Sequence, residues 1–290
     1  MVHGTNYVVP PTRCARVVSV YDCWFLDHPD DAHPDVRRAG EVLRRSIADG
    51  AHVVASSTAT ADRLGELFTT DRVHTILLGP PPVQSQTSST ARPPAVRPPA
   101  VLSGDVLADD APVVVAIGTV ERRKNLPMLI AAFARLAAEH ETVHLVVAGR
   151  AGDDSPALLG ATEGLERPVR DRVHVIGPID ETARRWLLGR ATCLAYPSLD
   201  EGFGFPVLEA QMAGTPVVAS SAGSIPEVAG NGALFSLPTD PVALAANLFG
   251  VVTDESRRSG LIEAGHRNLE RFSWETTARG LAALYRDLAT

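Results

Sequence analysis

Short runs of apolar, mostly β-branched residues alternate with longer helical stretches over the last two thirds of the chain. The clearest run, 113–118, is too short for a helix and ends in a glycine, which is typical of a buried parallel strand. Strands are expected at 113–118, 143–148, 172–176, 192–195, 216–219 and 233–235, and helices at 126–140, 180–190, 205–213, 224–229, 240–252 and 256–271. This alternation predicts an α/β fold with a doubly wound parallel sheet.

The first part of the chain repeats the alternation on a smaller scale. Strands are expected at 16–20, 52–55 and 73–78, with helices at 34–49 and 58–68. A run rich in proline, serine and threonine follows without hydrophobic periodicity, which is typical of an extended linker. These features predict a partial N-terminal Rossmann-like domain over 1–83, a linker over 84–110, a larger domain over 111–272 and a terminal helix over 273–290, capped by Ser273.

The segment from Tyr196 to Ser220 carries the most specific chemistry. Gly202 and Gly204 allow the backbone to approach a ligand closely, and Pro206 suits the first turn of a helix, where its missing N–H costs nothing. We therefore expect a helix to start near Phe205. Its free N–H groups and positive dipole end would face a phosphate above the Gly-Phe-Gly turn.

Two carboxylates, Glu201 and Glu209, frame this turn. Glu209 lies about one turn inside the expected helix, from where it could accept two hydrogen bonds from a ribose cis-diol. Glu201 precedes the helix and could reach a second polyol on the other side of the phosphates. The two carboxylates predict a nucleotide-sugar site, although such glutamates also occur near helix starts as solvated residues favoured by the dipole.

Three cations, Arg122, Arg123 and Lys124, follow the expected strand 113–118. They come after the carboxyl end of a strand, which is where ligands bind in open α/β sheets. Asn125 is expected to cap the next helix, with Pro127 in its first turn. A solvated basic turn is the alternative interpretation, and the glutamate segment favours the binding role.

The Glu-x7-Glu segment followed by Ala-Gly-Thr-Pro-Val-Val-Ala-Ser, and the block Gly-Thr-Val-Glu-Arg-Arg-Lys-Asn, closely resemble motifs of the retaining GT-B glycosyltransferases of family 4, the group 1 glycosyl transferases. The resemblance implies two Rossmann-like domains with parallel sheets, the N-terminal one incomplete, and a terminal helix that returns to it. It implies catalytic roles for Glu201, Arg123 and Lys124, with the two cations holding the donor diphosphate. It also implies donor contacts from Gly118, Thr119, Gly202, Phe203, Gly204, Phe205, Val207, Leu208 and Glu209, and acceptor-side roles for Tyr21 and Asp22.

By this resemblance the protein transfers a hexose from a nucleoside-diphosphate sugar, linked to GDP or UDP, to an acceptor hydroxyl with retention of configuration. The acceptor is expected to be a saccharide, a glycolipid or another hydroxyl compound, as for mannosyltransferase-like enzymes of polysaccharide biosynthesis. The sequence has no Asp-x-Asp motif, which agrees with metal-independent transfer, and no cofactor beyond the sugar nucleotide is expected. The front-face mechanism inferred for the family requires no nucleophile.

Composition disfavours several other classes of protein. The formal charge is −7 and the pI about 5.7, so no overall positive field attracts nucleic acid, and net charge does not support peripheral membrane contact. The three cysteines, Cys14, Cys23 and Cys193, make neither a disulfide framework nor a metal-binding spacing. No apolar run approaches about 18 residues, and the first residues do not resemble a secretory signal. We therefore expect a cytoplasmic protein.

Two departures from the family pattern bear on activity. The opening strand and glycine-rich loop of the first domain have no counterpart, and Tyr21 stands where the family usually has a histidine near the reacting sugar. Tyrosine donates a hydrogen bond but does not carry a proton at neutral pH as imidazole does. The alternatives are a non-catalytic remnant or partner subunit that binds nucleotide sugar, and a GT-B epimerase. A glycoside hydrolase is disfavoured, because its two carboxylates usually come from separate elements.

Two further residues are ambiguous in sequence. The resemblance brings His3 near the mouth of the cleft, and a structural histidine at a strand end is an equal alternative. Glu227 begins an expected helix, where a carboxylate is favoured by the dipole, and we expect no catalytic role for it.

Overall fold

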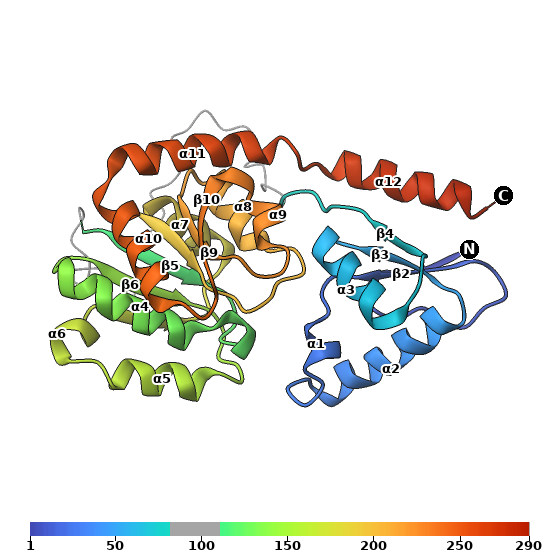
Figure 1. Cartoon of the computed structure of the whole chain (residues 1–290), viewed down its shortest axis with the longest axis horizontal. Helices are drawn as coiled ribbons and strands as arrows, with labels where there is room; N and C mark the ends of the chain where they lie inside the picture. The colour runs from blue at the N-terminus through green and yellow to red at the C-terminus, as the bar shows by residue number, and fades with distance from the viewer. Residues whose placement is uncertain (82–110, 290) are drawn as a thin grey trace.

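The computed structural model describes residues 1–81 and 111–289. These residues form two α/β bodies, each built on a parallel sheet, and the last helix reaches from the second body to the first (Figure 1). We call residues 1–81 the N-terminal domain and residues 111–272 the C-terminal domain. The expected linker, 84–110, lies outside the described residues.

The N-terminal domain has a four-stranded parallel sheet in the order β1-β2-β3-β4. Its strands are β1 (Val2–Gly4), β2 (Arg16–Val20), β3 (His52–Ala55) and β4 (Val73–Thr75), and its helices are α1 (Trp24–Asp27), α2 (Pro34–Ala48) and α3 (Thr58–Phe68). Val18 and Val53 from the sheet pack with Leu43 of α2 and Leu64 of α3 in one buried cluster. The small βαβ body expected from the sequence is therefore present.

The C-terminal domain has a six-stranded parallel sheet in the order β10-β9-β8-β5-β6-β7. Its strands are β5 (Val113–Ile117), β6 (His144–Ala148), β7 (Val173–Gly177), β8 (Cys193–Tyr196), β9 (Val217–Ser220) and β10 (Ala233–Ser236). Its helices are η2 (Arg122–Lys124), α4 (Leu126–Glu139), α5 (Ser155–Glu163), α6 (Arg167–Arg170), α7 (Glu181–Arg190), α8 (Phe205–Met212), α9 (Ile225–Ala229), η3 (Gly230–Gly232), α10 (Pro241–Thr253) and α11 (Glu255–Leu269). The order reverses at β5, as in a doubly wound sheet.

Both faces of the larger sheet are covered, which explains why its strands are apolar throughout. Val114 faces a cluster that includes Phe133 of α4 and Leu248 of α10. The next residue, Val115, faces the opposite cluster, which includes Leu187 of α7 and helices α8 and α9. The prediction of a doubly wound parallel sheet is confirmed.

The switch in strand order brings two distant loops together. β5 pairs with β6 on one side and β8 on the other, so the chain leaves these strands in opposite directions across the sheet. A crevice forms at the carboxyl ends of strands where connections diverge in this way. The loop after β5, which carries the three cations, and the loop after β8, which carries Glu201, therefore meet at one edge.

Helix α12 (Trp274–Asp287) lies along the N-terminal domain (Figure 1). Its Leu284 packs against Val17 and Val54 of that domain's sheet, and Ser273 caps the helix by accepting from the Thr276 N–H, as expected. His3 lies beneath α12, where Nδ1 contacts the Tyr285 hydroxyl at 2.5 Å. The structural alternative for His3 is therefore correct, and the predicted place at the cleft mouth is wrong.

Some local predictions were wrong. β1 was not expected, because its three residues are too few for a periodic pattern. β4 ends at Thr75 rather than at 78, since Leu77 and Leu78 turn away to pack with Phe203 and Phe272. The short helices α5 and α6 were missed, and they carry weak or mixed apolar patterns.

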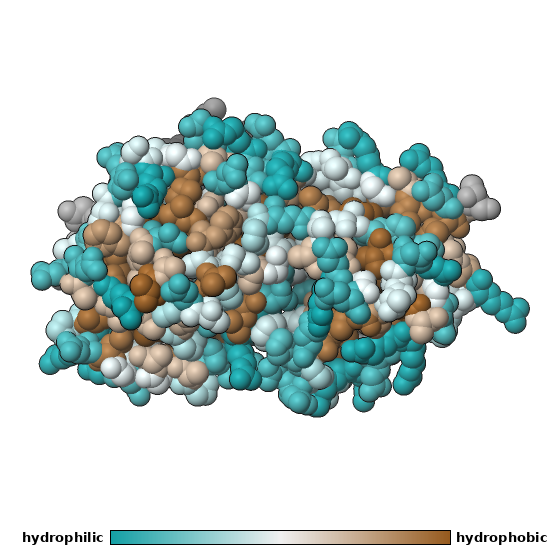
Figure 2. Space-filling model, in the orientation of Figure 1, coloured by the Kyte–Doolittle hydropathy of each residue, from teal (hydrophilic) through white to brown (hydrophobic). Residues whose placement is uncertain are grey.

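The hydropathy of the surface is that of a folded protein with its apolar residues mostly inside. Hydrophilic side chains cover much of the face in Figure 2, and apolar residues are visible as separate patches on it. In the described part of the chain, no helix is long and apolar enough to cross a membrane.

The contact between Gly118 and Gly149 gives a test of the switch-point geometry. A Cβ atom on Gly149 would lie 1.7 Å from the Gly118 carbonyl oxygen, so the ends of β5 and β6 would have to separate. We expect Gly149→Ala to lower the free energy of unfolding by about 3 kcal/mol. In α5, Gly160 has nothing within 4 Å of such a Cβ, and Gly160→Ala should raise stability by about 0.5 to 1 kcal/mol. Denaturant unfolding measures the free energy of unfolding of both variants. Equal changes in the two variants would contradict the close approach of Gly149 to Gly118.

Candidate functional site

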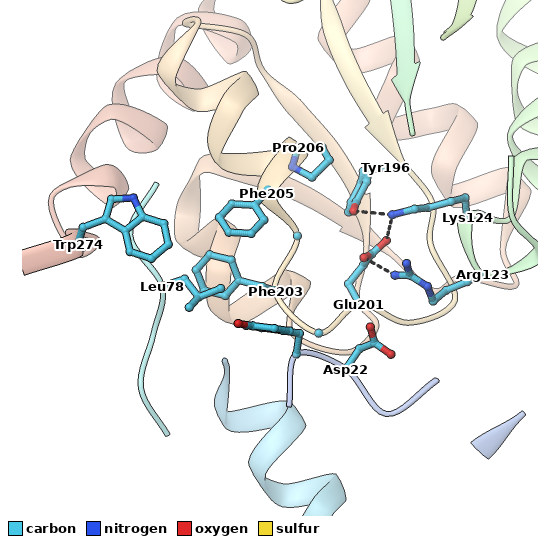
Figure 3. A pocket seen from close by; sticks show the side chains of 13 residues that line it. Asp22, Leu78, Arg123, Lys124, Tyr196, Glu201, Phe203, Phe205, Pro206 and Trp274 are labelled. Atoms are coloured by element: carbon cyan, nitrogen blue, oxygen red, sulfur yellow. Dashed lines mark hydrogen bonds and ion pairs between the residues drawn. The ribbon is translucent and has the colours of Figure 1, made fainter. Parts of the chain in front are cut away.

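A cavity of about 490 Å³ lies at the edge where the two loops meet. The ends of β5 and β8 supply its charged groups, and the start of α8 supplies an aromatic side (Figure 3). Tyr21 and Asp22 line it from the N-terminal domain, and Trp274 lines it from α12. The cavity therefore brings together groups from three separate parts of the chain.

The turn after β5 aims two cations at the cavity. Arg123 and Lys124 lie in the short helix η2, and Asn125 ends it in a left-handed conformation with φ of 55°. The Asn125 amide donates to the Pro197 carbonyl at 3.1 Å and to the Pro238 carbonyl at 2.8 Å. Asn125 therefore ties this turn to the loops after β8 and β10, and the expected side-chain cap on α4 is absent.

Glu201 is the centre of the charged network, and its side chain is only 6% exposed. Arg123 donates to its Oε2, and the Lys124 ammonium lies 2.5 Å from its Oε1. Ser198 donates to the same Oε1 at 2.7 Å, and Lys124 also donates to the Tyr196 hydroxyl at 3.0 Å. Figure 3 shows the two cations converging on this one carboxylate. Both cations therefore pair with Glu201, and Arg123 also lies 3.5 Å from the Glu121 carboxylate.

Burial and charge act against each other on these groups. Burial alone would raise the pKa of Glu201, but the attraction of Lys124 and Arg123 holds its pKa below the ordinary value. Burial lowers the pKa of Lys124, because the loss of water around the ammonium outweighs the attraction of Glu201. Burial raises the pKa of Tyr196 well above its usual value, so the phenol stays protonated. Glu201 is therefore an anion and accepts hydrogen bonds.

The loop after Glu201 leads into α8 through two glycines. Gly204 has φ of 93°, a conformation that favours glycine, and α8 starts at Phe205 as predicted. Gly204 provides no side chain to cap the helix, and Pro206 has no N–H. The start of α8 faces the cavity and carries the positive end of the helix dipole, which suits an anion.

An apolar wall lies opposite the charged groups. Phe203 and Phe205 stack edge to face with ring centroids 5.1 Å apart, and Leu78 and Trp274 extend this wall (Figure 3). The Trp274 indole is held by a hydrogen bond to the Pro80 carbonyl at 2.8 Å. Four lining residues were not predicted from the sequence: Leu78, Trp274, Tyr196 and Pro206. No local sequence pattern indicates that these residues line a cavity, because each one fits equally well as part of a strand, a loop or a helix start.

Tyr21 and Asp22, the predicted acceptor-side residues, line the cavity with their polar groups already engaged. The Tyr21 hydroxyl donates to the Thr5 carbonyl at 2.8 Å. Asp22 accepts from the Tyr7 hydroxyl at 3.2 Å and from the Trp24 N–H at 3.1 Å. Both side chains are therefore fixed in orientation by the N-terminal domain.

Glu209 lies in a second cavity of about 300 Å³ between α7 and α8. Arg184 of α7 donates from both Nε and one terminal nitrogen to a single oxygen, Oε2. Burial raises the pKa of Glu209, and Arg184 opposes that shift. Arg184 was not predicted from the sequence, because a charged residue on a helix normally reads as solvated surface.

The remaining predicted donor residues do not line the large cavity. Val207 and Leu208 are buried in apolar clusters, and the Val207 N–H donates to the Gly204 carbonyl at 3.0 Å. Their side chains therefore belong to the core that supports α8, and donor contacts at these two positions stay predictions. Gly118 lies beside the Lys124 stem, and Thr119 packs near Gly152, so both support the turn after β5.

Within residues 1–81 and 111–289, no three histidine, cysteine, aspartate or glutamate side chains are grouped so that they could hold a metal ion.

Removing the Glu201 carboxylate should destabilise the fold, because Arg123 and Lys124 are then buried without this partner. We expect Glu201→Gln to lower the free energy of unfolding by about 3 kcal/mol at pH 7, because breaking a buried pair leaves charge uncompensated. Without the Glu201 charge, the pKa of Lys124 in the folded protein falls below its wild-type value. Above that pKa the unfolded chain binds more protons than the folded protein does. The free energy of unfolding of the variant therefore rises with pH in this range. The deficit should shrink between pH 7 and pH 9 in denaturant unfolding. The matched change Glu275→Gln, at an exposed pair, should have little effect at either pH. A deficit independent of pH would contradict the charge network.

Several solved structures have the same architecture as this chain. One is WaaG, a glycosyltransferase involved in lipopolysaccharide biosynthesis, with a TM-score of 0.73 and 18% identity, over 97% of this chain and 76% of that one. Another is Anabaena HepE in complex with UDP and glucose, with a TM-score of 0.72 and 19% identity, over 94% of this chain and 72% of that one. The predicted GT-B-like fold is confirmed.

Sequence comparison gives the family. The chain is 30% identical over 279 residues to the O-antigen chain mannosyltransferase B of Escherichia coli, covering 94% of this chain and 70% of the relative. It is 31% identical over 264 residues to the D-inositol 3-phosphate glycosyltransferase of Xylanimonas cellulosilytica, covering 88% of this chain and 61% of that relative. The chain thus spans only part of the length of these curated relatives. The family profile described as "Glycosyl transferases group 1" matches residues 104–268, which is more than half of the chain, and the protein belongs to this family.

Proposed function

We propose that the protein is a retaining, metal-independent hexosyltransferase that uses a GDP- or UDP-linked sugar and a hydroxyl acceptor. The observation that carries this proposal is the pair of cations, Arg123 and Lys124, held by Glu201 beside the start of α8. Two cations that face the cavity next to a helix N-terminus can both donate charge-assisted hydrogen bonds to a diphosphate.

The donor spans the two cavities in this proposal. Its diphosphate lies between the cations and the Gly204 turn, and its nucleoside extends toward Glu209 in the cavity between α7 and α8. Arg184 binds only Oε2 of Glu209, which leaves Oε1 to accept a ribose hydroxyl. The sugar faces Glu201, whose Oε2 accepts from Arg123 and keeps lone-pair capacity for a sugar hydroxyl.

The proposed chemistry needs no covalent intermediate. The bond between the anomeric carbon and the β-phosphate oxygen breaks, and the acceptor oxygen bonds to that carbon from the same face. The acceptor proton passes to the leaving phosphate oxygen. Arg123 and Lys124 stabilise the charge that develops on the diphosphate, an interaction that strengthens in the transition state. No cofactor takes part.

The acceptor in this proposal is a saccharide, a glycolipid or another hydroxyl compound. The Escherichia coli relative is named a mannosyltransferase of an O-antigen chain, and the Xylanimonas relative a glycosyltransferase of D-inositol 3-phosphate. HepE was crystallised with UDP and glucose. These names support a hexose donor and a polyol acceptor.

A non-catalytic nucleotide-sugar binder is the second candidate, and one observation favours it. Tyr21 replaces the family histidine, and its hydroxyl already donates to the Thr5 carbonyl. This candidate keeps the donor site and lacks transfer, so binding and turnover separate the two.

Binding of the donor nucleotide is the first test. We expect UDP or GDP to raise the melting temperature, since a ligand bound only by the folded state stabilises it by about 2.7 kcal/mol at 100 times its dissociation constant. Lys124 is the only lysine in the sequence, so acylation of the chain reports on it and the terminal amine alone. The bound nucleotide should protect Lys124, as read by mass spectrometry.

Controls distinguish the possible outcomes of this test. Lys124→Met and Glu209→Gln should abolish the thermal shift, whereas Glu139→Gln, at an exposed residue of the same domain, should not. Transfer in the presence of a chelator, with the product anomer read by NMR, tests metal independence and retention. Binding without transfer supports the second candidate, and no binding by the folded chain contradicts both.

The Arg184–Glu209 pair predicts a pH dependence. Glu209 must be ionised to accept two ribose hydrogen bonds, burial raises its pKa, and Arg184 opposes that shift. In Arg184→Met the pKa of Glu209 rises further, so the ratio of mutant to wild-type dissociation constants should be larger at pH 6 than at pH 8. Arg185→Met removes the neighbouring arginine, which pairs with Glu181 instead, and should keep a constant ratio. Calorimetric titration at pH 6 and pH 8 measures these dissociation constants. A ratio for Arg184→Met that is the same at both pH values would refute the role of the pair.

A further inference from the structure

The segment 56–60, which leads from β3 into α3 of the N-terminal domain, is in direct contact with the loop that carries Glu201. The Ser56 hydroxyl donates to the Gly202 carbonyl at 3.0 Å, and the Thr60 hydroxyl lies 3.3 Å from the same oxygen. Ser56 and Thr60 are buried, with 2% and 4% exposure. Buried hydroxyls need partners, so these contacts define how the two domains meet.

Gly202 also fits closely against the backbone of the N-terminal domain. A Cβ atom at this position would lie 1.6 Å from the Tyr21 carbonyl oxygen. The Ser56 hydroxyl lies 2.8 Å from that same Tyr21 oxygen, so Ser56 touches both sides of the contact. The backbone on either side of Gly202 carries Glu201 and Phe203, which line the large cavity. A shift of the N-terminal domain would therefore move the cavity wall.

Glu227 of α9 makes a second contact across the domains, on the outer side of the same segment. Its Oε2 accepts from the Thr58 N–H at 2.8 Å, and its Oε1 accepts from the Thr58 hydroxyl at 2.8 Å. The Ala59 N–H lies 3.5 Å from Oε2. Arg271, which follows α11, donates to the Glu227 backbone carbonyl at 3.0 Å. This hydrogen bond holds the backbone of Glu227 in place. One carboxylate from the C-terminal domain thus satisfies the start of a helix in the other domain.

The electrostatics of this contact are favourable. The first N–H groups of α3 have no partner within the helix, and the positive end of its dipole attracts an anion. Ser57 caps the helix from within by accepting from the Thr60 N–H at 3.1 Å, which leaves Thr58 and Ala59 for Glu227. The two caps use different N–H groups, so Glu227 adds to the cap that the N-terminal domain provides for itself.

We propose that Glu227 is a positioning residue that docks the start of α3 on the Gly202 loop and so holds the acceptor-side domain against the donor site. Its consequence for transfer rests on the proposed function, whereas its consequence for domain docking does not. Nucleotide binding is independent of the contact, because Arg123, Lys124 and Glu209 all belong to the C-terminal domain. Transfer requires both domains and therefore depends on it.

The test combines solution scattering with binding and kinetics on the full chain. Glu227→Arg places a cation at the positive end of α3, and Glu227→Gln keeps an acceptor oxygen without the charge. We expect a larger radius of gyration for Glu227→Arg and a smaller increase for Glu227→Gln. Glu139→Arg makes the same charge change at an exposed site of the C-terminal domain and should leave the radius unchanged.

The kinetic readout separates positioning from loss of folding. We expect Glu227→Arg to bind the nucleoside diphosphate as wild type does, while kcat falls on the order of 100-fold, as for a small misplacement of reacting groups. Glu227→Gln should recover part of this loss. An unchanged radius of gyration in both Glu227 variants would overturn the proposal. If the wild type binds no nucleotide, the proposed function fails, and the scattering comparison still decides whether Glu227 docks the domains.

Discussion

The buried carboxylate of Glu201 is the interaction on which the rest of the site depends. Two cations next to each other on one turn repel, and Glu201, which lies between them, offsets that repulsion away from water. Arg123 and Lys124 lie in a place of low dielectric, where each cation acts strongly on an incoming anion. The same carboxylate is bound by Ser198, so the loop after β8 and the turn after β5 are joined as one unit.

The fold supplies the constraint that makes this pairing possible. Arg123 and Glu201 are far apart in sequence, and they meet because β5 and β8 are neighbours in a sheet whose connections diverge between them. Asn125 fastens the turn through two carbonyls, and the close contact of Gly118 with Gly149 sets the spacing of the strand ends. Domain docking adds a further contact, because Gly202 lies directly against Tyr21.

Sequence alone predicted what depends on local pattern. The strands of the C-terminal domain, the start of α8 at Phe205 and the Ser273 cap follow from periodicity, from proline at a helix start and from capping chemistry. The partners of the charged residues were not predictable in this way. Arg184 pairs with Glu209 across two helices, and Trp274 reaches the cavity only because α12 crosses to the N-terminal domain. Such contacts are set by tertiary packing and have no signature in a window of neighbouring residues.

The affinity for the second phosphate of the nucleotide tests the role of Arg123, Lys124 and Glu201 most directly. Calorimetric titration of the wild type with a nucleoside diphosphate and with the matching monophosphate compares ligands that differ in that group alone. If Arg123 and Lys124 hold the diphosphate, the diphosphate should bind about tenfold or more tightly than the monophosphate, as expected for charge-assisted hydrogen bonds. The advantage should vanish in Lys124→Met. Equal affinities in the wild type, or an advantage that survives in the variant, would contradict the role of the charged network.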